Sequence, residues 1–198
     1  MVLSSEVRTG VSREPHIYEI DEPKGLSGGD YGGVLQSGII MGLAADGTPI
    51  YGRTGPYVPS IAFPDVLNMV VTEAFESAFA ESGLSGASFA PIAIGRIVYV
   101  DWRNWGRDDW KYPSELGFGN DDEPGDYVRH GVDSPDLRNQ VGRLWRMSFV
   151  ELSSWNPKFN VFRLKRYMMK FVDDKAKAWL ERHCPGEFSL SAPGVQVT

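Results

Sequence analysis

The amino-acid sequence predicts an α+β domain in which a mixed or antiparallel sheet packs against two amphipathic helices. Three observations predict this class: short stretches of alternating polarity, two stretches with apolar residues at helical spacing, and frequent turn residues between them. The 22 glycines and 13 prolines favour many short elements over a helical bundle. With 42% hydrophobic and 23% charged residues, the chain is expected to bury one core as a single domain, residues 1–198.

The first elements along the chain are short. Residues 1–33 are predicted to form a polar, glycine-rich N-terminal arm that contains one stretch of alternating polarity, residues 16–20. Residues 34–43 are apolar and are followed by the dipeptide Asp46-Gly47 and a second apolar run. A turn dipeptide between two apolar runs predicts a β-hairpin.

An apolar stripe at i, i+4, i+7 and i+8 begins at Val71 and predicts a helix over Thr72–Gly83. The hydroxyl of Thr72 is placed to cap the free backbone donors at the start of this helix. Glycine is typical of helix ends, which agrees with the predicted end at Gly83. Residues 92–102 alternate in polarity and predict the next strand.

The second half of the chain begins with an irregular segment. Residues 103–130 contain several glycines and prolines, which we expect to prevent regular structure. Ser134 followed by Pro135 is typical of a helix start and predicts a short helix toward Leu144. The remaining predicted elements are strands over 145–152, 160–165 and 167–172 and a final helix over Asp173–His183.

The two main helices share a pattern, which indicates an internal pseudo-repeat. The final helix repeats the apolar spacing of the first at a constant offset of 101 residues, and Asp173 takes the capping position of Thr72. Each helix is followed by glycine and then phenylalanine, at Phe89 and Phe188. Coincidence is the alternative, because amphipathic helices share this spacing in general.

Charge and composition argue against several classes of protein. A net charge of −6 and a pI near 5.1 argue against a nucleic-acid-binding protein, which is normally basic. No stretch approaches 18 apolar residues and the N-terminus does not resemble a signal peptide, so we expect a cytoplasmic protein that does not bind membranes. The single cysteine, Cys184, excludes a disulfide framework and the zinc patterns that need two cysteines.

Candidate nucleophiles and metal ligands are few. Residues 25–29 match G-x-S-x-G, but they lack the preceding strand and following helix that hold such a serine on its strained turn. The three histidines are not spaced as metal ligands; His183 at a helix end is typical of a dipole partner, and Cys184 of a small core residue. We therefore expect no catalytic residue, no metal and no cofactor.

The main candidate for a functional region is the acidic, aromatic segment 101–126. Between residues 101 and 129 there are eight acidic and four basic residues, with tryptophans and tyrosines among them. Such a surface suits a basic protein partner, because aromatic residues contribute binding energy and charge speeds encounter. The candidate partner-binding residues are Trp105, Asp108, Asp109, Trp110, Asp121, Asp122 and Glu123.

Other interpretations of this segment remain open. Two carboxylates of the 101–126 loop and its aromatic side chains are also typical of a glycosidase-like cleft, which makes a small hydrolase the alternative function. The segment is otherwise a solvated loop whose tryptophans return to the core, or a surface for oligomers. Residues 158–182, with eight basic and three acidic residues, lack a nucleic-acid recognition pattern and are expected to pair with the acidic segment.

Two segments carry a resemblance to a known family. Phe63-Pro64-Asp65-Val66-Leu67, continuing through Val71-Thr72-Glu73 to Leu84-Ser85-Gly86-Ala87-Ser88-Phe89-Ala90-Pro91, resembles bacterial polymorphic-toxin immunity proteins of the group numbered eleven. Val161-Phe162-Arg163-Leu164 through Trp179 and Phe188 resembles the second helix unit of these proteins. The chain lacks the cysteines of the related double-CXXCG immunity proteins, and it has Thr72 where serine is commoner.

The resemblance covers about half of the chain and implies a class of function. It implies a cytoplasmic protein that binds and neutralises a cognate protein toxin and catalyses no reaction. None of the matched positions is a functional site of the family, so the resemblance assigns no site residue. The identity of the toxin and the oligomeric state are left open.

Overall fold

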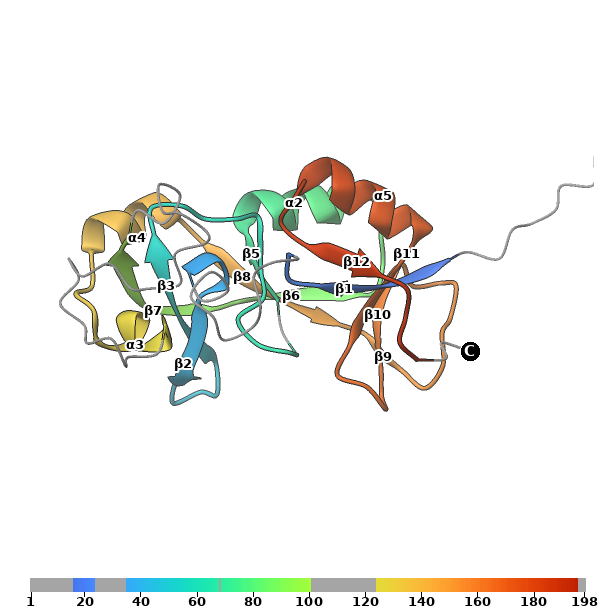
Figure 1. Ribbon diagram of the computed structural model, residues 1–198, viewed down its shortest axis with the longest axis horizontal. Coiled ribbons are helices and arrows are strands. Elements are labelled where there is room, and N and C mark those ends of the chain that lie inside the picture. Colours follow the sequence, from blue (N-terminus) through green and yellow to red (C-terminus); the bar gives the residue numbers. More distant parts are fainter. Residues whose placement is uncertain (1–15, 24–34, 68, 101–123, 196–198) are drawn as a thin grey trace, which may run out of the picture.

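The computed structural model describes residues 16–23, 35–67, 69–100 and 124–195 of the chain. Three sheets lie next to one another along the long axis of the molecule, and two helices cover one face of the region where two of the sheets meet (Figure 1). The predicted α+β class is confirmed. None of the helices in these ranges is long and apolar enough to cross a membrane.

The five-stranded sheet brings the two ends of the chain together. Its order is β12 (Ser189–Ser191), β1 (Ile17–Asp21), β11 (Lys170–Asp173), β10 (Val161–Leu164) and β9 (Glu151–Leu152). The β10–β9 pair is parallel and the other pairs are antiparallel. The strand β1 comes from the segment that was expected to form a polar arm, and its Ile20 is buried in the core. Residues 1–15 and 24–33 of that segment lie outside the described ranges.

The four-stranded sheet supports the first helix. Its strands, all antiparallel, are β4 (Ile61–Ala62), β5 (Met69–Thr72), β8 (Leu144–Phe149) and β6 (Ala87–Pro91), in that order. The helix α2 (Glu73–Glu81) follows β5 directly, as α5 (Asp174–His183) follows β11. Both helix predictions are therefore confirmed to within two residues.

The helix caps form as the sequence predicts. The backbone N–H of Phe75 donates to the Thr72 hydroxyl at 3.3 Å, and that of Ala176 donates to the Asp173 carboxylate at 2.8 Å. The apolar stripes of the two helices then meet in one core, where the Trp179 ring lies edge-on to Phe75. Their ring centroids are 5.2 Å apart, a favourable distance for an aromatic pair.

The three-stranded sheet forms the other end of the molecule. It consists of β2 (Ile39–Leu43), β3 (Pro49–Gly55) and β7 (Ala93–Tyr99), and the predicted β2–β3 hairpin is confirmed. The Asp46-Gly47 turn places Gly47 at φ +81°, where glycine is favoured. The predicted helix after Ser134 is α4 (Pro135–Val141), which is fixed to β7 because the Arg138 guanidinium donates to two β7 carbonyl groups.

One prediction for this region is wrong. Residues 124–130, expected to be irregular, form the helix α3 (Pro124–His130). A proline at the first position of a helix loses no hydrogen bond, because the N–H it lacks has no partner within the helix at that position. The helix packs closely on β3, where a Cβ atom on Gly52 would lie 2.7 Å from a methyl group of Val128. Residues 101–123 lie outside the described ranges.

The two helix units have the same topology and the same register. In each unit a strand from elsewhere in the chain separates the strands before and after the helix: β8 in the first unit and β1 in the second. Phe89 of β6 lies opposite Met147, and Leu190 of β12 lies opposite Ile20. The offset of 101 residues therefore continues into the strand after the helix. The counterpart of Phe89 is thus Leu190, and not Phe188 as the sequence pattern indicated.

The two units also contact each other reciprocally. The backbone N–H of Val161, at the start of β10, donates to the carbonyl of Ser85 in the turn after α2. The backbone N–H of Ile61, at the start of β4, donates to the Glu187 carboxylate in the turn after α5. The strand pair β10–β11 of the second unit therefore bonds to the turn after α2, and the strand pair β4–β5 of the first unit bonds to the turn after α5. Such reciprocal contacts are expected for two copies related by a pseudo-twofold axis.

Three basic residues of the segment 158–182, Arg163, Lys175 and Lys177, have partners close to them. The guanidinium of Arg163 pairs with Glu151 on the neighbouring strand. The ammonium group of Lys177 pairs with Glu181, and that of Lys175 donates to the carbonyl of Gly83 at 3.0 Å. Of the acidic segment 101–126 that was expected to pair with them, residues 101–123 lie outside the described ranges, and Asp126 pairs with Arg129 of its own helix.

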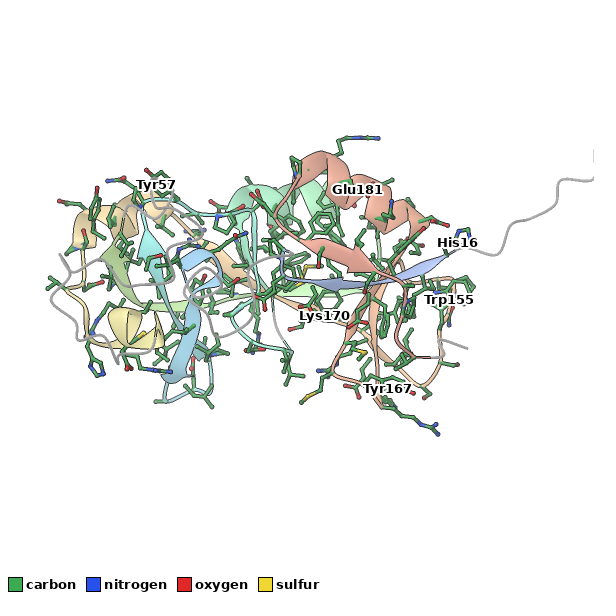
Figure 2. All side chains as sticks on the ribbon, in the orientation of Figure 1. His16, Tyr57, Trp155, Tyr167, Lys170 and Glu181 are labelled. Carbon is green, nitrogen blue, oxygen red and sulfur yellow. The ribbon has the colours of Figure 1, made fainter. Side chains whose placement is uncertain are left out.

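Lys170 on β11 is buried beside Phe63, with carboxylates nearby. Its side chain is 4% exposed, and its ammonium nitrogen lies 5.6 Å from the centre of the Phe63 ring. Burial lowers the pKa of Lys170, and the nearby carboxylates of Asp21 and Asp65 oppose this change. Figure 2 shows Lys170 at the centre of this half of the molecule.

This burial predicts a pH dependence of stability. Because the folded state binds the Lys170 proton less tightly than the unfolded chain, stability rises with pH from the lowered pKa up to the unfolded value of 10.5. In Lys170→Met this rise is expected to disappear. Urea unfolding of both proteins at several alkaline pH values measures it. A stability difference between the two proteins that is constant with pH would contradict this explanation.

Candidate functional site

A surface groove of about 650 Å³ lies between α5 and β12, at one edge of the five-stranded sheet. One wall is the outer face of α5, on which Figure 2 shows Glu181, and the other is the backbone of residues 188–192. Its volume is in the range of natural ligand-binding clefts. The lining residues are Tyr18, Lys177, Glu181, Pro185, Gly186, Phe188, Ser189, Leu190, Ser191 and Ala192.

The polar wall of the groove, lined by Tyr18, Lys177 and Glu181, belongs to a connected row of side chains that continues beyond the groove to Asp174. Asp174, Lys177 and Glu181 lie at i, i+3 and i+7 of α5 and therefore share one face of the helix. The Tyr18 hydroxyl donates to Asp174 at 3.0 Å, and the Lys177 ammonium nitrogen lies 5.3 Å from the centre of the Tyr18 ring. Lys177 also pairs with Glu181 at 2.8 Å.

These contacts shift the pKa values of the row. The hydrogen bond to Asp174 raises the pKa of Tyr18. The hydrogen bond from the backbone N–H of His16 is the main cause that lowers the pKa of Asp174. The hydrogen bond to Glu181 raises the pKa of Lys177. At neutral pH these shifts favour a charged Asp174, a charged Lys177 and a neutral Tyr18.

The floor of the groove is apolar and leads to a sheet edge. Phe188 and Leu190 are half-buried and pack against the core that the two helices share. The strand β12 pairs with β1 along one side, and it is the last strand of its sheet among the strands described here. The Ser189 hydroxyl donates to the carbonyl of Glu22 at 2.7 Å, which fixes β12 to the end of β1.

No local sequence pattern predicts this groove. All seven predicted partner-binding residues, Trp105, Asp108, Asp109, Trp110, Asp121, Asp122 and Glu123, lie in 101–123, outside the described ranges. Tyr18 and Asp174 are 156 residues apart in the chain, and the antiparallel pairing of β1 with β11 brings them together. The local signal was the alternating polarity of residues 16–20, which predicts a strand but not its partner.

The histidines have local structural contacts. His183 stacks on Trp179, with ring centroids 4.2 Å apart, and its Nδ1 lies 2.8 Å from the Trp179 carbonyl oxygen in the last turn of α5. His16 lies beside Asp174, and His130 lies 3.9 Å from Asp126. Within the ranges that the structure describes, no three His, Cys, Asp or Glu side chains are grouped to hold a metal ion.

Cys184 is a core residue, as the sequence predicts, and its thiol is expected to be unreactive in the folded protein. The side chain is 1% exposed, and burial raises its pKa to about 12. Because the thiolate is the nucleophile, iodoacetamide at mildly alkaline pH is expected to label this thiol only after urea unfolding. Mass spectrometry of the native and unfolded protein measures the difference, and rapid labelling of the native protein would contradict it.

Comparison of the chain with protein-family models, curated proteins and solved structures finds no match.

Proposed function

We propose that this chain is a cytoplasmic bacterial immunity protein that binds and neutralises a cognate protein toxin. The observation that supports the proposal is how the resembling segments fold. Residues 63–92 and 161–188 contain the two capped helices, and these helices pack into one core. The residues that resemble immunity proteins therefore lie in the two helix units and are not scattered over the molecule.

The chemistry of the groove supports binding of a polypeptide. Its charged side chains already have partners, as Lys177 does in Glu181, and the carboxylate of Asp174 is held by hydrogen bonds. An apolar floor, a polar wall and a strand edge together offer the contacts by which proteins recognise extended segments of other proteins. In the proposal, binding occludes the toxin, and it takes place in the cytoplasm.

The acidic, aromatic segment is a second proposed contact region. Alanine at Trp105, Asp108, Asp109 and Trp110 is expected to weaken partner binding because aromatic and charged residues dominate binding energies. The melting temperature of this variant is expected to stay close to that of the parent. A large fall in melting temperature would show that these side chains belong to the core.

The proposal is tested by co-expression with a toxin domain. The gene directly upstream is the source: if it encodes a large secreted protein, its C-terminal domain is expressed from an inducible promoter in a heterologous bacterium. Growth is expected to stop with the domain alone and to continue when the chain is co-expressed. An unrelated toxin domain serves as the specificity control and is expected to remain toxic.

The same pair is then measured with purified proteins. Because a ligand that binds only the folded state stabilises it, the chain is expected to gain about 2.7 kcal/mol when the toxin domain is present at 100 times its Kd. The neutralising function is overturned if the domain stays toxic in the presence of folded chain and isothermal titration calorimetry detects no binding.

A further inference from the structure

We propose that the groove between α5 and β12 binds an extended segment of the protein partner. The segment would add a strand to the outer edge of β12 and place a basic side chain against Glu181. This inference rests on the proposed function, in which the partner is the toxin. It names the surface on this chain and the chemistry of the segment that the surface recognises.

The strand β12 lies at the edge of the described five-stranded sheet. β12 pairs with β1 on one side, and among the strands that the structure describes none pairs with its other side. A sheet edge of this kind is a template for strand addition, in which backbone hydrogen bonds give affinity and side-chain subsites give specificity. The groove lies directly beside this edge.

The side chains beside the edge define the specificity. Successive residues of an added strand point to opposite faces of the sheet, so every second side chain of the segment faces the groove. Phe188 and Leu190 are half-buried and offer an apolar subsite. Next to it lies the carboxylate of Glu181, which is paired with Lys177, and the carboxylate of Asp174 lies on the same face of α5 beyond the residues that line the groove. The matching segment therefore has apolar and basic residues at alternate positions.

The first helix unit provides an internal comparison. At the offset of 101 residues the counterpart of Glu181 is Ala80, and the counterpart of Lys177 is Glu76. In the sheet register, Tyr18 lies opposite Val172 as Trp145 lies opposite Val71. The indole nitrogen of Trp145 is buried, whereas Tyr18 presents a phenol that is bonded to α5. The acidic position of Asp174 is shared, because its counterpart is Glu73, whereas the Lys177–Glu181 ion pair and the bonded phenol of Tyr18 are particular to the second unit.

The experiment uses two synthetic peptides and the full chain. Both peptides are acetylated, amidated heptapeptides: Thr-Leu-Thr-Arg-Thr-Leu-Thr, and the same sequence with Glu in place of Arg. Each is titrated into the ¹⁵N-labelled protein, and amide shifts are followed by NMR. The arginine peptide is expected to shift the amides of β12 and of the second half of α5, and to bind about two- to fivefold more tightly than the glutamate peptide.

Charge reversal at the groove gives the decisive comparison. Glu181→Lys is expected to abolish or reverse the preference for the arginine peptide. Glu81→Lys is the matched control, because it makes the same substitution at an exposed position of α2 and is expected to leave the preference unchanged. The inference is overturned if the two peptides bind equally, if the shifts lie outside the groove, or if both variants change the preference alike.

The result is independent of the co-expression test. If the parent chain neutralises the toxin domain and Glu181→Lys neutralises it equally well, the groove is not the toxin-binding surface and the proposed function stands. If the parent fails against the toxin domain while the arginine peptide binds selectively in the groove, the proposed function falls and the specificity of the groove stands. A second copy of the chain is the other possible occupant of the groove. Size-exclusion chromatography with light scattering tests for it, because such a copy would give a dimer that Glu181→Lys weakens.

Discussion

Replacement of Phe79 by alanine is expected to lower the free energy of unfolding by about 3–5 kcal/mol. Phe79 is 4% exposed, and its ring centroid lies 6.1 Å from that of Phe75, 5.4 Å from that of Phe89 and 5.5 Å from that of Trp179. The ring thus contacts its own helix, the following strand and the helix of the other unit. Removing it leaves a cavity that all three would have to close.

Urea unfolding followed by tryptophan fluorescence and by far-UV circular dichroism measures this effect. Ser77→Ala, an exposed position on the same helix, is the control and is expected to change stability by less than about 0.5 kcal/mol. The two signals are expected to fall together, because the helices share one core. If the fluorescence and the circular dichroism of Phe79→Ala changed at different urea concentrations, the two helix units would unfold separately.

Replacement of Asn160 by alanine is expected to cost about 2–3 kcal/mol, because partly buried groups lose their hydrogen-bond partners. The Asn160 side-chain amide donates to the Asp173 carboxylate at 2.8 Å, and its carbonyl oxygen accepts from the backbone N–H of Ser85 at 3.0 Å. Asp173 caps α5, and Ser85 belongs to the turn after α2. One side chain therefore connects the cap of one unit to the turn of the other.

Asn160→Asp separates loss of the hydrogen bond from loss of volume. The aspartate keeps the size of the side chain, but it places a second carboxylate against Asp173. Repulsion raises the pKa of the new group in the folded state, so the folded state binds its proton more tightly than the unfolded chain does. This variant is expected to recover stability relative to the parent as the pH falls. Urea midpoints of both proteins across mildly acidic pH measure this recovery, and a difference that is constant with pH would contradict it.

The sequence predicts the elements whose causes are local. The caps at Thr72, Asp173 and Ser134 and the turn at Gly47 follow from residues within a few positions of one another. The offset of 101 residues between the helices also lies in the sequence itself, and the strand register extends it. The error at α3 arose because a proline that begins a helix and one that prevents a helix look alike when the neighbouring pattern is weak.

Strand pairing is the part that the sequence did not predict. That β8 lies between β5 and β6, and β1 between β11 and β12, depends on contacts between distant residues with no local signature. The groove shares this origin, since Tyr18 meets Asp174 through the pairing of β1 with β11. The aromatic and acidic composition of residues 101–126 predicted a functional region there, because composition can be read from a sequence and a surface shared by distant residues cannot.

The position of β1 has a consequence for how the chain is made. β1 precedes all the other described strands in the sequence, but both of its neighbours in the sheet, β11 and β12, are among the last of them. The five-stranded sheet therefore cannot assemble in its observed order until residues 170–191 have been synthesised. Until then β1 lacks its native neighbours, and unpaired strands that are exposed during folding are prone to aggregate. Slow translation or loss of β12 would therefore leave β1 without a native neighbour in the sheet.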